Sequence, residues 1–138
     1  MIESEGACLS IRKGGVAWEA RLTAAHHQLS HIERRMSGTA PTDELWALWM
    51  QAELEFHQTL ISACGSDLLP QIHLNLYYQF RQQLVEIDRK LDNLAENIVQ
   101  HEVILEAAIA GDEARTREAI RAHFARHLAH EPTIAKAV

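Results

Sequence analysis

Helix-breaking residues are scarce in this sequence, which has only six glycines and three prolines among 138 residues. A convincing run of alternating polar and apolar residues, the pattern of a half-buried strand, is also lacking. Alanine, leucine, glutamate and arginine are abundant instead, and all four are strong helix formers. The composition therefore predicts an all-α protein, and the length fits one domain spanning residues 1–138.

Four further features that are missing or scarce argue against whole classes of protein. No apolar stretch approaches the ~18 residues of a membrane span, and the acidic N-terminus lacks the apolar segment of a secretory signal peptide. The formal net charge of −6 argues against nucleic-acid binding by this chain alone, because such binding needs a concentrated basic surface. The two cysteines, Cys8 and Cys64, form no CxxC pair, so we expect buried free thiols in a cytoplasmic protein.

Apolar residues recur at helical spacing and predict an antiparallel bundle of about six helices. We place these helices at about residues 3–12, 17–36, 43–64, 67–91, 93–110 and 113–130. Thr42 is expected to cap the third helix, Gly65 to end it, and Asp112 to cap the sixth. The fourth helix is expected to turn an apolar stripe toward the core, formed by Leu69, Ile72, Leu76, Phe80, Leu84, Ile87 and Leu91.

Ionisable residues interrupt the core-facing surfaces of three helices. Glu53 and His57 are four residues apart on the third helix and share a face, while His101 lies in the apolar stripe of the fifth. His101 lies ten residues before the Gly-Asp turn and His123 eleven after it, so both imidazoles lie about 15 Å from the turn in an antiparallel hairpin. Three imidazoles and one carboxylate suit Zn²⁺, Ni²⁺ or Mn²⁺. We therefore predict one divalent metal site formed by Glu53, His57, His101 and His123.

Other interpretations of the histidines stay open. One histidine on an apolar helix face is usually a core residue that bonds a backbone group, although the convergence of four such groups by accident is rare. His27 with His31 and His123 with His127 are also spaced four residues apart. The first pair lacks an inward acid. His127 is an alternative to His123 as a ligand, or it contacts a ligand without touching the metal itself. The HExxH, GxSxG and paired Glu-x-x-His motifs are absent, so catalysis is poorly supported.

The fourth helix carries His73, Tyr77 and Arg81 at intervals of four residues. Arg81 could face solvent, which is the commoner fate of an arginine, or point into the bundle beside the metal. A guanidinium there would hold a carboxylate through two parallel hydrogen bonds, and Tyr77 could add a phenol hydrogen bond. Arg81, Tyr77 and His127 are thus the candidate contacts for a small organic acid with one or two carboxylates.

The segments "ELEFHQTLISACGSDLL" and "QHEVILEAAIAGDEARTREAIRAHF" resemble the C-terminal ligand-sensing domain of GntR-family transcription regulators, in the FadR-like (FCD) group. The resemblance covers about residues 2–130 and implies a bundle of six or seven helices. It also implies a divalent metal bound through an Asp and three His, with small carboxylates against it. The matching positions here are Glu53, His57, His101 and His123, and Arg81 matches a frequent arginine. The segment "AWEARLTAAHHQLSHIERR" looks most similar to regulators of carbon-starvation and amino-acid or dicarboxylate catabolism genes.

The sequence departs from the family pattern in two side chains and one domain. Glu53 stands where the family usually has Asp, which puts the coordination distance in doubt, and the usual Glu-His pair is Gln100-His101. No segment resembles the N-terminal winged helix-turn-helix that binds DNA. The resemblance therefore implies a fragment or truncated product that senses an effector and forms a homodimer, reaching DNA only through the missing domain.

Two rival functions fit the same residues. One is a metal-dependent enzyme in which the ion activates water and Glu53 or His127 acts as a base. The other is a helical dimerisation module that binds no metal.

Overall fold

The protein is all-α, as predicted, and its computed structural model describes residues 1–38, 40–88 and 94–129. Residues 80–88 and 126–129 are described only as helical backbone. Within these ranges the chain forms six helices and no strand: α1 (Ile2–Lys13), α2 (Gly15–Met36), α3 (Asp43–Leu60), α4 (Leu68–Asp88), α5 (Leu94–Ile109) and α6 (Glu113–Ala129). None of the helices in the described ranges combines the length and the apolar character needed to cross a membrane.

Two helices begin at the side-chain caps that the sequence predicts. The Thr42 hydroxyl accepts a hydrogen bond from the backbone N–H of Leu45 (3.2 Å), and Asp112 Oδ1 accepts one from that of Arg115 (3.0 Å). Each oxygen satisfies a first-turn N–H that has no partner within its own helix. Gly111 closes the turn between α5 and α6 with a φ of +71°, a conformation that favours glycine.

Helix α3 ends about one turn before Gly65, so the predicted end was wrong. The Thr59 carbonyl accepts a hydrogen bond from the indole N–H of Trp18 (2.9 Å). The backbone N–H of Ala63, which would bond to Thr59 in a continuing helix, donates instead to the Ser10 hydroxyl (3.1 Å). Contacts from α1 and α2 therefore replace the next helical hydrogen bond.

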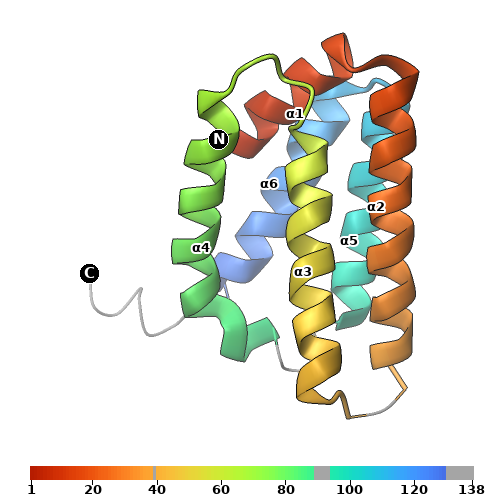
Figure 1. Cartoon of the computed structure of the whole chain (residues 1–138), viewed down its shortest axis with the longest axis vertical. Helices are drawn as coiled ribbons and strands as arrows, with labels where there is room; N and C mark the ends of the chain where they lie inside the picture. The colour runs from red at the N-terminus through yellow and green to blue at the C-terminus, as the bar shows by residue number, and fades with distance from the viewer. Residues whose placement is uncertain (39, 89–93, 130–138) are drawn as a thin grey trace.

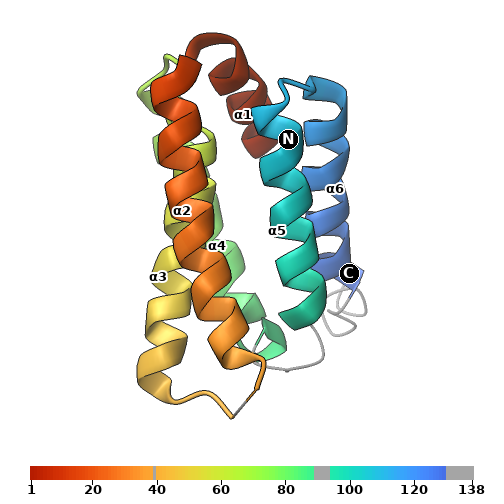
Figure 2. The same ribbon diagram turned by 90° about the vertical axis from the view of Figure 1, so that its right-hand side faces the viewer.

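Successive helices run in opposite directions from α2 onward, and α2, α3, α5 and α6 lie side by side (Figures 1 and 2). The short α1 lies at one end of this group and packs against α3, α4, α5 and α6. Helix α4 lies at the edge of the bundle, and in the described part of the chain its main neighbour is α1. The apolar core is formed mainly by Trp18, Leu22, Leu29, Met36, Trp49, Phe56, Leu60, Ile104 and Ile120.

Helix α1 lies close to the segment that follows α3 because Gly6 has no side chain. A Cβ atom at this position would lie 2.8 Å from Cβ of Ile61 and 2.9 Å from Cδ2 of Leu69. Glu3 lies three residues earlier on the same helical face, and the close packing leaves only 2% of it exposed.

The cysteines Cys8 and Cys64 are buried and free, as predicted.

The predicted core-facing stripe of α4 was wrong in its first half. Ile72 is 39% exposed and Leu76 is 47% exposed, whereas His73 between them is 5% exposed. Helix α4 is rotated in this way because it packs on α1, where His73 Nε2 lies 3.9 Å from the buried Glu3 Oε2. The second half of the predicted stripe lies outside the side chains that the structure describes: Phe80, Leu84, Ile87 and Leu91.

Candidate metal centre

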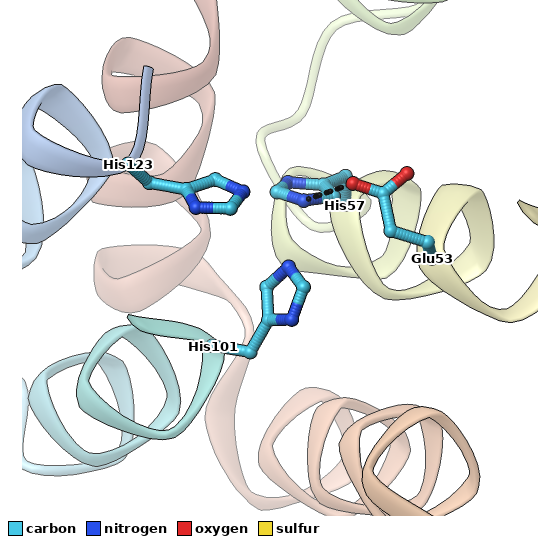
Figure 3. A group of neighbouring side chains, drawn as sticks. All are labelled: Glu53, His57, His101 and His123. Carbon is cyan, nitrogen blue, oxygen red and sulfur yellow. Dashed lines mark ion pairs between the residues drawn. The ribbon is translucent and has the colours of Figure 1, made fainter. Parts of the chain in front are cut away.

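Four buried polar side chains from three helices meet inside the bundle (Figure 3). Glu53 and His57 come from α3, His101 from α5 and His123 from α6. One potential ligand atom from each lies within 4.8 Å of those of the other three, and each residue is at most 4% exposed. The structure thus brings together all four residues of the predicted metal site.

The three imidazoles surround a common point and leave little room between them (Figure 3). Ring centroids are 4.8 Å apart for His101 and His123, 5.5 Å for His57 and His101, and 5.6 Å for His57 and His123. Glu53 Oε1 lies 3.1 Å from His57 Nε2, across one turn of α3. This is the spacing at which an ion of the size of Zn²⁺ could replace a hydrogen bond.

Each imidazole is held on its outer side by an acceptor from another helix. His57 Nδ1 contacts Glu3 Oε1 of α1, His101 Nδ1 lies 3.4 Å from Glu33 Oε1 of α2, and His123 Nδ1 lies 2.6 Å from Gln100 Oε1 of α5. An acceptor at Nδ1 favours a proton there and leaves the Nε2 lone pair for a metal. Three outer contacts therefore orient three inward nitrogens.

The inner nitrogen of His101 provides a test of whether a metal fits. His101 is fully buried, and its Nε2 has no hydrogen-bond partner among the described residues. Leaving a buried polar atom unsatisfied costs about 1–3 kcal/mol. A divalent cation coordinated by this nitrogen would remove the cost, and the three-imidazole, one-carboxylate set matches borderline metals. The residues present fit a metal ion.

The outer acceptors were not predicted from the sequence, although Glu33 carried a signal. Glu33 is 1% exposed and follows Leu29 at i+4, so it continues the buried face of α2. Its other oxygen accepts a hydrogen bond from the indole N–H of Trp49 (3.3 Å). Glu3 gave no such signal, because an acid in the first helical turn is ordinary at a helix N-terminus.

The carboxylates beside His57 control its charge when no metal is bound. Burial by itself lowers the pKa of His57, but the charges of Glu3 and Glu53 and their hydrogen bonds outweigh it and raise that pKa to about 10. Burial likewise raises the pKa of Glu3, yet His57 and His73 lower it to about 2. Metal-free His57 is therefore an imidazolium between two carboxylates at neutral pH. A metal ion would have to displace one proton from it.

The predicted ligand-binding residues lie on α4 and α6. Tyr77 lines a cavity of about 430 Å³, together with Met1, Ile2, Glu3, His73, Leu76 and Phe124. The cavity adjoins the four-residue cluster, since Glu3 contacts both the cavity and His57, and the rings of His57 and Tyr77 are 6.3 Å apart. Arg81 lies on α4 and His127 on α6, but both side chains lie outside those that the structure describes.

Comparison with known proteins places the sequence beside transcription regulators. The FCD domain family model matches residues 1–126. The uncharacterized HTH-type transcriptional regulator BphR of Paraburkholderia xenovorans is 31% identical over 126 residues, which cover 89% of this chain and 49% of that protein. The HTH-type transcriptional repressor GlaR of Escherichia coli is 33% identical over 120 residues, covering 84% of this chain and 53% of that protein. The chain thus spans about half the length of these relatives. No solved structure was found to match it.

We expect the metal-free protein to be most stable between about pH 4.5 and pH 6.5. The pKa of His57 is raised from 6.5, so its contribution is complete below that pH and is lost as the pH rises toward about 10. The pKa of Glu3 is lowered from 4.5, so its contribution is complete above that pH and is lost as the pH falls toward about 2. Thermal unfolding in chelator should show a midpoint that falls from about pH 6 to about pH 9.

The double variant Glu3→Gln with His57→Gln isolates this effect, because it removes both titrating groups of the pair. The difference in unfolding midpoint between the two proteins should shrink as the pH rises over the same interval. A wild-type midpoint that rises relative to the variant would contradict the assigned charge state of His57.

Proposed function

Because the chain belongs to the FCD domain family, we propose that residues 1–138 form the effector-sensing and dimerisation domain of a GntR-family transcription regulator. In this proposal the domain binds a divalent metal ion and a small carboxylate, and its ligand state controls DNA binding elsewhere in a longer protein. The HTH-type regulators BphR and GlaR support it, since the chain covers about half of each. A helix-turn-helix domain would occupy the other half.

The metal-binding part of the proposal rests on one observation above all. Three imidazoles, each held at Nδ1 by an acceptor, direct their remaining nitrogens at one point beside a carboxylate. Glu53, His57, His101 and His123 would hold the ion, with Zn²⁺, Ni²⁺ or Mn²⁺ as the best matches. The ion would supply positive charge and open coordination positions for an anionic effector. The structural roles of Glu3, Glu33 and Gln100 would be to fix the rings.

The cavity beside the cluster is the proposed effector site. Tyr77 lines it, Arg81 lies one turn further along the same face of α4, and His127 lies one turn beyond His123 on α6. A carboxylate bound between the metal and Arg81 would link α4 to the three ligand-bearing helices. A dicarboxylate would satisfy both positive groups at once, since a guanidinium pairs with carboxylates through parallel hydrogen bonds.

The proposed mechanism is thermodynamic linkage between effector and bundle arrangement. Helix α4 has few contacts with the described part of the bundle apart from α1, so its position is where an added ligand would have the largest effect. The effector shifts the equilibrium only as far as its affinities for the two arrangements differ. In a homodimer such a shift would change the spacing of two DNA-binding domains.

The His101→Ala variant should lose stoichiometric metal, because it removes one of the four proposed ligands, the fully buried His101. Elemental analysis of purified, dialysed protein should find about one metal ion per wild-type chain. The matched control is His26→Ala, since His26 lies outside the cluster, half-buried against Phe56. Equal metal content in the two variants would contradict the proposed site. If the wild-type protein held no metal even after metal loading, a metal-free dimerisation module would be favoured.

Removing the negative charge of Glu33, which lies beside Nδ1 of His101, should weaken metal binding without removing a ligand. The Glu33→Gln substitution keeps the shape and a hydrogen-bond acceptor, and we expect the metal dissociation constant to rise about 10- to 100-fold. Competition with a chromophoric chelator measures this constant. Glu55→Gln on the exposed face of α3 is the control and should change it little. An unchanged constant for Glu33→Gln would refute the orienting role.

Effector binding is tested by thermal unfolding with a panel of small mono- and dicarboxylates. A true effector at a hundred times its dissociation constant should stabilise the metal-loaded protein by about 2.7 kcal/mol, and chelator should abolish the effect. Arg81→Gln should weaken the effector about 10- to 100-fold, whereas Arg21→Gln on the exposed face of α2 should not. Hydrolytic turnover by the metal-loaded protein would overturn the sensor function in favour of an enzyme.

A further inference from the structure

A second pair of histidines lies on the outside of the bundle, away from the cluster. His27 and His31 are four residues apart on α2, and both are exposed. Their rings face each other with a centroid separation of 6.3 Å and an interplanar angle of 19°. Among the described residues, neither ring has a hydrogen-bond or ion-pair partner. Four imidazole nitrogens are therefore available to a ligand from solvent.

The geometry of the helix makes these two side chains a chelating pair. Residues at i and i+4 are stacked on one face, one turn apart, and two histidines at this spacing on a helix are a recurrent zinc-binding arrangement. Because both side chains are exposed, small rotations about their side-chain torsions can bring one nitrogen of each ring onto one ion. No backbone movement is needed.

The pair lines a hollow in the surface, and Arg34 is the one arginine in its lining. A depression of about 230 Å³ is lined by His27, His31, Thr23, Ser30, His26 and Arg34. The hydroxyls of Thr23 and Ser30 are neutral and small, so water can complete the coordination sphere there. Arg34 adds a positive charge, which opposes a cation but favours an anionic co-ligand. The pair should thus bind metal more weakly than a buried four-ligand site.

We propose that His27 and His31 form a surface site for a transition metal ion, separate from the buried cluster. Two imidazoles with water as the remaining ligands select for late divalent metals, in the order Cu²⁺ above Ni²⁺ and Zn²⁺, and disfavour Mn²⁺. This assignment does not depend on the proposed sensor function, since no residue of the buried cluster takes part in it.

Copper titration of the full chain tests the site, with bound Cu²⁺ followed by calorimetry and by electron paramagnetic resonance. The comparison is with a double variant, His31→Ala with Gln28→His, which keeps nine histidines but makes the pair adjacent in sequence. Side chains at i and i+1 do not face each other on a helix, so chelation is lost. The two substituted positions, 28 and 31, and the retained position 27 are all exposed. Circular dichroism verifies that the variant keeps the fold.

The expected result is one equivalent of Cu²⁺ more in the wild type than in the double variant, with nitrogen hyperfine structure from two imidazoles. Breaking the chelate should lower the affinity for that additional Cu²⁺ ion on the order of a hundredfold. Identical titrations of the two proteins would overturn the proposal. The His101→Ala variant separates this result from the buried site: it should lose the buried equivalent and keep the one that His31→Ala with Gln28→His removes.

Discussion

The rest of the structure depends on how a group of ionisable side chains finds hydrogen-bond and charge partners inside an apolar core. Glu3, Glu33, Glu53, His57, His101 and His123 are each at most 4% exposed. Moving a charge out of water is costly unless it is paired and hydrogen-bonded. All six described helices contribute to this network, α4 through His73, which lies 3.9 Å from Glu3 Oε2. The contacts that orient the imidazoles also link α1 to α3, α2 to α5, and α5 to α6. A fold that misplaced α1 would separate the buried Glu3 carboxylate from His57, its charged partner.

Much of this arrangement could be predicted because it follows from helical periodicity. The i, i+4 relation places Glu53 and His57 on one face, and nearly equal distances from the Gly111–Asp112 turn place His101 and His123 at nearly one height. The outer contacts needed tertiary information. Glu3 and His57 are 54 residues apart in sequence, and no pattern in α1 indicates which helix it crosses.

The error in α4 has a related cause. Periodicity finds the apolar face of a helix but does not identify the neighbour against which that helix packs. Here the neighbour is α1, with the buried Glu3, and a polar imidazole suits a position 3.9 Å from that carboxylate better than a leucine would. His73 therefore faces inward, and Leu76 lies at the edge of the cavity with Tyr77. His73, the inward-facing residue that breaks the predicted apolar pattern, thus lines the cavity of the proposed effector site.

Glu53 shows how the metal-free and metal-bound states of the proposed site would compete. In the metal-free chain its carboxylate lies 3.1 Å from His57 Nε2, the nitrogen that a metal would need. A shorter aspartate at this position would reach His57 less easily, so the extra methylene of glutamate stabilises the protonated, metal-free pair. Metal binding must then replace one proton held between Glu3 and Glu53. Of two otherwise equal sites, the glutamate version should bind metal less tightly at acidic pH, so occupancy of the proposed site would depend more strongly on pH.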